Sequence, residues 1–266
     1  MIGYNSDYSK IYSQSSDAGL NYNKRIGNRF ENFIFDLEKY FLVKIFNDLQ
    51  NQDKNYLDFA CGTGRIIRFI SQNFRFRSYI GYDLSPQMVE EAQKSIKSAE
   101  VKFIVGDITK NGGSLPDDYF ELVTAFRLIL NLEPNNRLNI LRALHNKLSS
   151  DGYLVVNNHM NRYSLMGVIA WLLHQVMRWP LKNDLAALRL GRRRIISTMS
   201  QCEVRKLLDE TGFKIIKIYH FTFFPGYKNF VILPPRILFY VELFISSLPL
   251  VNYFTKDQIY VCVKKN

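Results

Sequence analysis

Cysteine is scarce in this 266-residue chain, which contains Cys61, Cys202 and Cys262 with no C-x-x-C pair among them. An odd number of widely separated cysteines favours neither a disulfide framework nor a zinc site, so we expect no structural metal. The first residues also lack the cationic stretch and apolar run of a secretory signal. These absences predict a protein that works in the reducing cytoplasm.

Long apolar runs are missing as well. The two most apolar stretches are residues 165–173 and 237–245, and each is about nine residues long. A membrane-spanning helix needs about 20 consecutive apolar residues, and Pro234, Pro235 and Pro249 bracket the second stretch. We therefore expect no transmembrane helix.

Acidic residues are few in the second part of the chain. Residues 151–266 hold 16 Lys and Arg against 7 Asp and Glu, whereas residues 1–150 hold 19 against 17. The difference places a surplus of 9 of the 11 net positive charges in the second part. Such a field indicates an anionic partner, such as a phosphate, a nucleic acid or an acidic lipid. A basic surface that serves solubility alone is the other interpretation.

The segment from Asn55 to Arg65 organises the rest of the chain. Its sequence N-Y-L-D-F-A-C-G-T-G-R leads from an apolar run through Asp58 into a glycine turn, and apolar residues at helical spacing follow. This pattern predicts a strand, a turn and a helix whose first backbone N–H groups can face a ligand. By itself, a turn with two glycines also fits an ordinary connection between a strand and a helix.

Two further predicted strands end on carboxylates. The strand over residues 78–82 ends at Asp83, and the strand over residues 101–106 ends at Asp107. Asp83 follows Asp58 by 25 residues, as expected of a carboxylate that accepts hydrogen bonds from the two ribose hydroxyls of a nucleotide. Since open α/β sheets bind ligands at the carboxyl ends of their strands, the three aspartates predict a shared site.

These motifs resemble those of the class I S-adenosylmethionine (SAM) methyltransferases. In the family pattern L-D-x-G-x-G-x-G, this chain has Leu57, Asp58, Gly62 and Gly64, with Ala60 in place of the first glycine. The pattern G-x-D-x-S-x-x-M matches Gly81, Asp83, Ser85 and Met88, and the third-strand G-D pair matches Gly106 and Asp107. A dinucleotide site fits less well, because the third glycine of G-x-G-x-x-G is absent.

The resemblance implies that the cofactor is SAM. It places the backbone of residues 60–64 against the methionine part of SAM, Asp83 on the ribose, and Asp107 with Ile108 at the adenine. Phe126 and Arg127, after the fourth strand, would border the transferred methyl group. The implied cofactor site comprises Asp58, Ala60, Cys61, Gly62, Thr63, Gly64, Asp83, Leu84, Met88, Asp107, Ile108 and Phe126.

Strand and helix patterns alternate along the chain, which predicts an α/β fold with a doubly wound, mostly parallel sheet. The resemblance implies a seven-stranded Rossmann-like sheet whose last strand runs antiparallel. We expect a single domain over residues 1–266. Residues 1–50 would form an N-terminal helical extension, and residues 162–199 and 223–256 would form helical insertions that cap the site.

The predicted fifth strand ends in the polar sequence N-N-H-M-N, which includes His159. An imidazole titrates near neutral pH, so His159 is a candidate general base, and Arg127 is a second candidate catalytic residue. A histidine that only hydrogen-bonds a loop is the alternative.

These observations predict O-methylation of a glycan or of a phosphorylated or lipid-linked small acceptor. An RNA methyltransferase that uses the basic cluster Arg192–Arg194 is one alternative, and a SAM-binding protein without turnover is another. A nucleic-acid base is a less favoured substrate, because the Asn/Asp-Pro-Pro-Tyr/Phe motif is missing after the fourth strand. The favoured interpretation of the apolar stretches is a lid over an amphipathic acceptor. They would otherwise contact an anionic membrane, with Arg189 and Arg192–Arg194 at the head groups, or be buried against the sheet or a second subunit.

Overall fold

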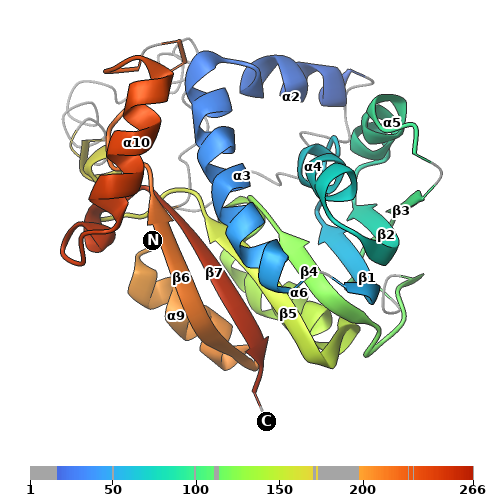
Figure 1. Cartoon of the computed structure of the whole chain (residues 1–266). Coiled ribbons are helices and arrows are strands. Elements are labelled where there is room, and N and C mark those ends of the chain that lie inside the picture. The colour runs from blue at the N-terminus through green and yellow to red at the C-terminus, as the bar shows by residue number, and fades with distance from the viewer. Residues whose placement is uncertain are drawn as a thin grey trace, which may run out of the picture.

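The computed structural model describes residues 17–49, 51–98, 100–110, 114–169, 172, 198–226, 228, 229 and 231–265. Its centre is a seven-stranded sheet with helices on both faces (Figure 1). The strands are β1 (Asn51–Phe59), β2 (Phe76–Asp83), β3 (Val101–Val105), β4 (Phe120–Ala125), β5 (Leu148–Asn158), β6 (Phe213–Phe221) and β7 (Asp257–Lys264).

The strand order β3-β2-β1-β4-β5-β7-β6 brings β1 between β2 and β4. The pairs among β3, β2, β1, β4 and β5 are parallel, and β7 runs antiparallel to both β5 and β6. The order of the strands reverses at β1, which is where open α/β sheets form a ligand-binding crevice. The predicted fold, including the antiparallel last strand, is confirmed.

Helices pack on the two faces of the sheet and bury separate apolar cores. The helices are α2 (Ala18–Ile26), α3 (Arg29–Leu49), α4 (Arg65–Asn73), α5 (Pro86–Ser95), α6 (Pro134–Lys147), α9 (Gln201–Glu210) and α10 (Pro235–Ser246), with 3-10 turns η2 (Ile129–Asn131) and η3 (Val251–Phe254). One core joins α3, α4 and α10 through Phe46, Ile67 and Leu238. The other joins α6 and α9 through Leu144 and Leu208.

Local sequence signals explain several helix boundaries. Apolar residues at helical spacing in α3 are buried, and Ile34, Leu37 and Phe46 are inaccessible to solvent. Ser85 caps α5 by accepting a hydrogen bond from Met88 N, and Ser200 forms a capping box with Glu203 at the start of α9.

Residues 18–26 form the helix α2 although their sequence is largely polar. Tertiary packing explains this helix: a Cβ atom on Gly19 would lie 2.7 Å from Glu91 Cβ, so the glycine lets α2 approach α5 closely.

The two insertions are described to different extents. Within residues 223–256 the structure contains α10 and η3, and α10 packs against α3 and β6. Most of residues 162–199, including Arg189 and Arg192–Arg194, lies outside the described residues. Every helix in the described ranges is too short or too polar to cross a bilayer.

Candidate functional site

The turn between β1 and α4 is built from residues in the left-handed backbone region. Ala60 has φ 55°, Gly62 has φ 54° and Gly64 has φ 79°. A Cβ atom on Gly64 would lie 2.8 Å from Ile96 Cδ1 and 3.1 Å from Ala92 Cβ, so packing against α5 also requires glycine there. This tight turn leads into the N-terminus of α4, where the positive end of the helix dipole suits an anionic or polar ligand.

Asp58 fixes the base of this turn. Its buried carboxylate accepts hydrogen bonds from Ile67 N at 3.1 Å and from Thr124 Oγ1 at 2.8 Å. Burial raises the pKa of Asp58 to about 7, and the nearby charge of Asp83 adds to this effect. Asp58 therefore ties β1 to β4 and to the first turn of α4, and both of its oxygens are engaged.

Asp83 at the end of β2 holds the turn from the opposite side. It accepts hydrogen bonds from Gly62 N at 2.8 Å and Ser85 N at 2.9 Å. Burial raises the pKa of this carboxyl. Each oxygen of a carboxylate has two lone pairs, so Asp83 keeps acceptor capacity for ligand hydroxyls while its orientation is fixed.

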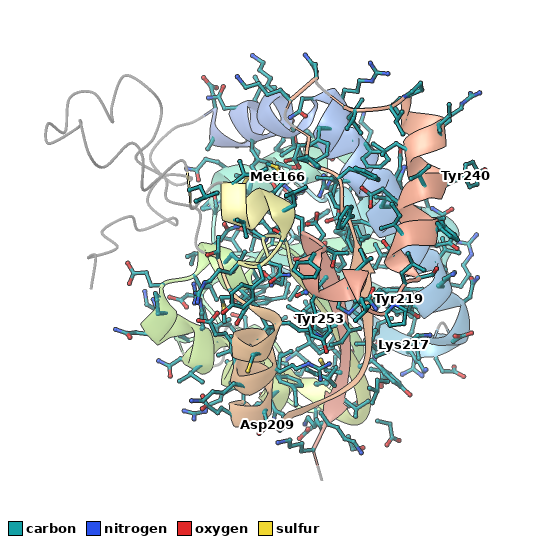
Figure 2. All side chains as sticks on the ribbon, turned by 90° about the vertical axis from the view of Figure 1, so that its left-hand side faces the viewer. Met166, Asp209, Lys217, Tyr219, Tyr240 and Tyr253 are labelled. Carbon is teal, nitrogen blue, oxygen red and sulfur yellow. The ribbon has the colours of Figure 1, made fainter. Side chains whose placement is uncertain are left out.

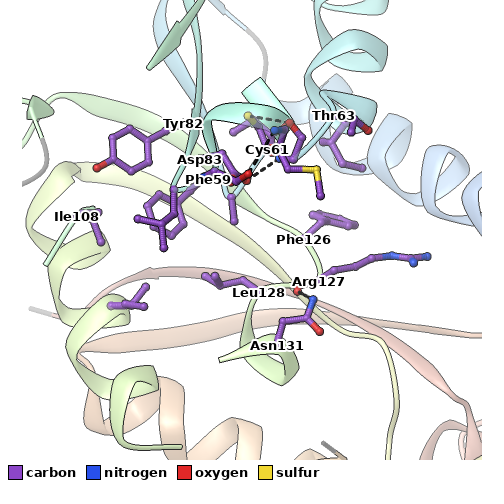
Figure 3. A pocket seen from close by; sticks show the side chains of 18 of the residues that line it. Phe59, Cys61, Thr63, Tyr82, Asp83, Ile108, Phe126, Arg127, Leu128 and Asn131 are labelled. Atoms are coloured by element: carbon purple, nitrogen blue, oxygen red, sulfur yellow. Dashed lines mark hydrogen bonds between the residues drawn. The ribbon is translucent and has the colours of Figure 1, made fainter. Parts of the chain in front are cut away.

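A cavity of about 550 Å³ opens at the carboxyl ends of β1, β2 and β4 (Figure 3). The predicted residues that line it are Asp58, Ala60, Cys61, Gly62, Thr63, Asp83, Leu84, Met88, Asp107, Ile108, Phe126 and Arg127. Gly64 and His159 are absent from the lining. The predicted residues that line the cavity therefore come from the ends of four strands, β1, β2, β3 and β4, as expected for the crevice of a doubly wound sheet.

One end of the cavity is formed by Tyr82, Asp107 and Ile108. Asp107 accepts hydrogen bonds from Thr109 Oγ1 at 2.6 Å and Thr109 N at 3.0 Å, and these contacts lower its pKa. The Tyr82 hydroxyl is buried and has no partner among the described residues. A Cβ atom on Gly106 would lie 2.5 Å from that hydroxyl, which explains the glycine.

Arg127 lines the other end of the cavity (Figure 3). Arg127 has φ 55° and its backbone is held on both sides: its N donates to Asn157 Oδ1 at 2.6 Å, and its carbonyl accepts from Asn131 Nδ2. Its Nη2 pairs with Glu31 of α3 at 2.6 Å. Its Nε is buried and has no partner in the described part of the chain.

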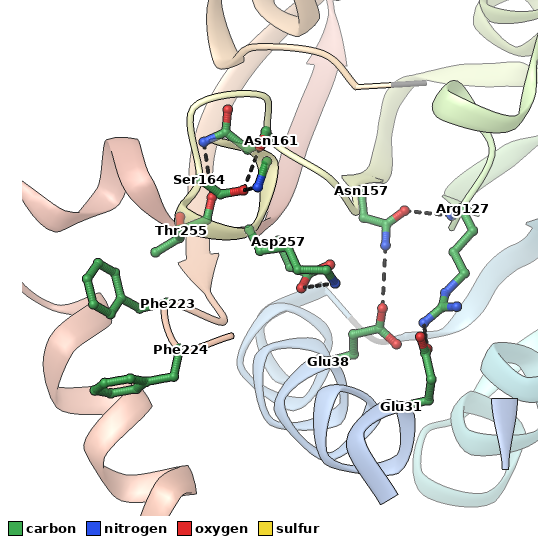
Figure 4. Close-up of polar contacts among 12 residues, drawn as sticks. Glu31, Glu38, Arg127, Asn157, Asn161, Ser164, Phe223, Phe224, Thr255 and Asp257 are labelled. Carbon is green, nitrogen blue, oxygen red and sulfur yellow. Dashed lines mark hydrogen bonds and ion pairs between the residues drawn. The ribbon is translucent and has the colours of Figure 1, made fainter. Parts of the chain in front are cut away.

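A second glutamate of α3 extends this polar network (Figure 4). Glu38 is fully buried, pairs with Arg65 Nη2 at 3.0 Å and accepts a hydrogen bond from Asn157 Nδ2 at 3.4 Å. Glu31 and Glu38 are seven residues apart, about two helical turns, so both point from one side of α3.

Burial alone would lower the pKa of Arg127, but Tyr22, Glu31 and Glu38 outweigh it and raise the value. Arg127 is therefore a permanent cation whose direction α3 sets.

His159 lies beyond the end of β5, and its Nδ1 is buried without a partner among the described residues. Burial, followed by the charges of Arg127, Lys256 and Arg65, lowers the pKa of His159 well below its ordinary value. The imidazole is therefore neutral near pH 7, as a base must be, but it is a weak base. The role of His159 stays a prediction.

Several cavity residues were not predicted from the sequence. Tyr22 reaches the cavity from α2, and its neighbour Asn23 accepts a hydrogen bond from Thr63 Oγ1 at 2.7 Å and donates to Glu91 at 3.1 Å. No local pattern indicates this contact, because α2 meets the turn only in the folded chain. Arg65 also lines the cavity. Its position directly after the glycine turn is the sequence signal that indicates this.

Comparisons with known proteins agree with this geometry. Residues 57–152 match the family described as "Methyltransferase domain". Two curated relatives are malonyl-[acyl-carrier protein] O-methyltransferases from Coxiella burnetii and Halalkalibacterium halodurans, 29% and 39% identical over 70 and 64 residues. These segments cover 26% and 24% of this chain, and the chain spans only 28% and 24% of the length of those relatives.

A similar solved structure is Haemonchus contortus phosphoethanolamine N-methyltransferase 2 in complex with SAM. It has a TM-score of 0.61 and 15% sequence identity, and the match covers 98% of this chain and 60% of that one. Residues 57–152 thus match a methyltransferase domain, and the chain shares its fold with a solved methyltransferase.

Proposed function

We propose that this protein transfers the methyl group of SAM to an oxygen of a small acceptor that carries an anionic group. Phosphorylated or lipid-linked sugars are the acceptors that the sequence favours. The observation that supports the proposal best is Arg127, a fixed cation in the cavity wall whose Nε has no partner among the described residues. A guanidinium in this setting suits a phosphate or carboxylate.

We propose that the cavity residues bind SAM in distinct roles. Asp83 is proposed to bind the ribose hydroxyls, Asp107 the adenine amino group, and the turn around Gly62 the methionine part. A volume of about 550 Å³ lies within the range of roughly 300–1,000 Å³ for small-molecule sites. Bound SAM supplies a methyl group activated by a sulfonium. The protein must then orient the acceptor oxygen in line with that group, and alignment of this kind can account for much of a rate enhancement.

Oxygen is the proposed acceptor atom because both curated relatives are named O-methyltransferases. A carboxylate or phosphate oxygen is already ionised and needs no base. A hydroxyl must lose a proton, and His159 is then the proposed base. No histidine is among the residues that line the described cavity.

Transfer of labelled methyl groups tests the proposal. The protein would be incubated with SAM that carries a tritium-labelled methyl group and with separate soluble, lipid and RNA fractions of cells. Label in a small soluble or lipid product, which Arg127→Gln abolishes while SAM still binds, supports it. Label that ribonuclease releases indicates the RNA methyltransferase instead. SAM binding without label in any fraction indicates a SAM-binding protein without turnover.

A further inference from the structure

The side of α10 that points away from the protein is apolar. Tyr240 is 73% exposed, Phe244 is 67% exposed and Ile237 is 55% exposed. These positions recur at three- and four-residue spacing, so they form one stripe along the helix. A helix that is apolar on its outer side as well as its inner side is usually covered on both.

The inner side of α10 is firmly attached, which fixes the direction of the outer stripe. Leu238 and Glu242 are buried, and Phe239 meets Tyr40 of α3 with ring centroids 5.8 Å apart. The carboxylate of Glu242 accepts hydrogen bonds from Phe223 N at 2.7 Å and Phe224 N at 2.8 Å. Rotation of the helix to bury the outer stripe would break these contacts.

Further exposed apolar side chains extend this surface. They are Leu250, Tyr253 and Phe254 in and beside η3, and Leu165, Val168 and Ile169 in the helical segment after β5. In Figure 2, Tyr253 and Met166, which belong to these two segments, lie on the face turned toward the viewer, and Tyr240 projects at the right-hand edge of that view. We call Ile237, Tyr240, Phe244, Leu250, Tyr253 and Phe254 together the outer apolar face.

Along the sequence that forms this face, the exposed charged residues are basic. From residue 213 to residue 265 the sequence contains two acids, Glu242 and Asp257, and both are buried. Basic residues in the same stretch include Lys214, Lys217, Lys228 and Arg236, all of which are exposed. The surface therefore combines exposed aromatic rings and cations with no exposed acid in that stretch.

We propose that the outer apolar face rests on the surface of an anionic membrane. Tyrosine and phenylalanine enter the head-group region, and lysine and arginine attract acidic lipids. A second copy of the chain would bring like charges together. Residues 173–197 are a poorer occupant for the same reason, because they hold six Lys and Arg and one Asp. The lining of the described cavity includes no residue of α10, so the face can bind lipid while the cavity stays open.

Vesicle sedimentation tests this proposal without cofactor or acceptor, so its outcome is independent of the proposed methyl transfer. The full chain would be mixed with vesicles of phosphatidylcholine, with and without phosphatidylglycerol, at low and moderate salt. We expect binding to the anionic vesicles that weakens as salt is added. The double variant Tyr240→Ser/Phe244→Ser should bind at least about tenfold more weakly, since two aromatic rings no longer leave water.

Tyr119→Ser is the matched control, because Tyr119 is an exposed tyrosine that precedes β4 and lies outside the outer apolar face. It should sediment like the wild type, and calorimetry should show unchanged SAM binding in every variant. No sedimentation at low salt would overturn the proposal. So would wild-type binding by the double variant, or a dimer in analytical ultracentrifugation that the double variant converts to monomers without any lipid binding.

Discussion

Glu31 Oε2 lies 2.6 Å from Arg127 Nη2, although the two residues are 96 positions apart in the sequence. This ion pair joins α3 to the residue that follows β4, beside the cavity. The N-terminal helices therefore contribute to the position of a cavity residue as well as to the packing of the sheet.

Replacement of Glu31 by glutamine should disturb Arg127. The cation would lose its carboxylate partner while it stays largely buried, so we expect the free energy of unfolding to fall by about 1–3 kcal/mol. SAM affinity should be nearly unchanged, and methyl transfer should fall. Urea unfolding and calorimetry measure the first two effects.

The control is Asp36→Asn on the same helix, which removes the more exposed ion pair with Lys39 at 2.6 Å. It should cost less than about 0.5 kcal/mol. Equal losses for the two variants would contradict the proposed importance of the Glu31–Arg127 pair.

Asp83→Ala should weaken SAM binding. The substitution removes the acceptor proposed for both ribose hydroxyls, so we expect a loss of at least about 1.5–3 kcal/mol in binding free energy. It also frees Gly62 N and Ser85 N, so circular dichroism must confirm that the variant is folded. A folded Asp83→Ala protein that binds SAM as tightly as the wild type refutes the ribose assignment.

His159→Ala separates a general base from a structural histidine. If His159 removes a proton from the acceptor, its loss should slow turnover by roughly 10²–10⁴ with SAM affinity unchanged. The lowered pKa places the acidic limb of the wild-type pH–rate profile below the ordinary histidine value of 6.5. Turnover within a few-fold of wild type would show that the histidine is dispensable, as expected for an acceptor that is already ionised.

Glu242 should make stability depend on pH. Burial raises its pKa from 4.5 to about 7 in the folded protein, so the folded state binds a proton more tightly than the unfolded chain. The resulting stabilisation is complete below the unfolded pKa and is lost as the pH rises through the folded pKa. The loss is up to about 3 kcal/mol.

Glu242→Gln removes this titration. The difference in Tm between wild type and variant should therefore shift in favour of the variant as the pH rises from about 5 to about 8. Asp58 also has a pKa near 7, but it is present in both proteins and its effect cancels in the difference. A difference that stays constant with pH would show that Glu242 does not titrate in this range.

The sequence predicted the cavity residues best where each of them lies at the end of a predicted strand. Asp58, Asp83 and Asp107 each follow a predicted strand, and parallel strands end at one edge of the sheet, so their meeting at one cavity could be foreseen. Their roles toward the cofactor came from the family resemblance.

Contacts between distant segments could not be foreseen. Glu31 and Glu38 are two of several charged residues on α3, and nothing nearby in the sequence identifies Arg127 and Arg65 as their partners. Tyr22 belongs to a short polar helix whose formation depends on the close approach of Gly19 to α5. Such contacts are decided by tertiary packing, which hydrophobic periodicity does not report.

The left-handed conformation of Ala60 bears on how the cofactor turn behaves before any ligand arrives. An alanine at φ 55° costs roughly 1–2 kcal/mol relative to its preferred conformations, and glycine would avoid this penalty. Alanine, however, samples fewer backbone conformations than glycine in the unfolded chain, which offsets part of that amount. The methyl group of Ala60 also reduces the number of backbone conformations that the turn can adopt without a ligand. Less conformational entropy then remains to be lost on binding, so a single methyl group preorganises the site.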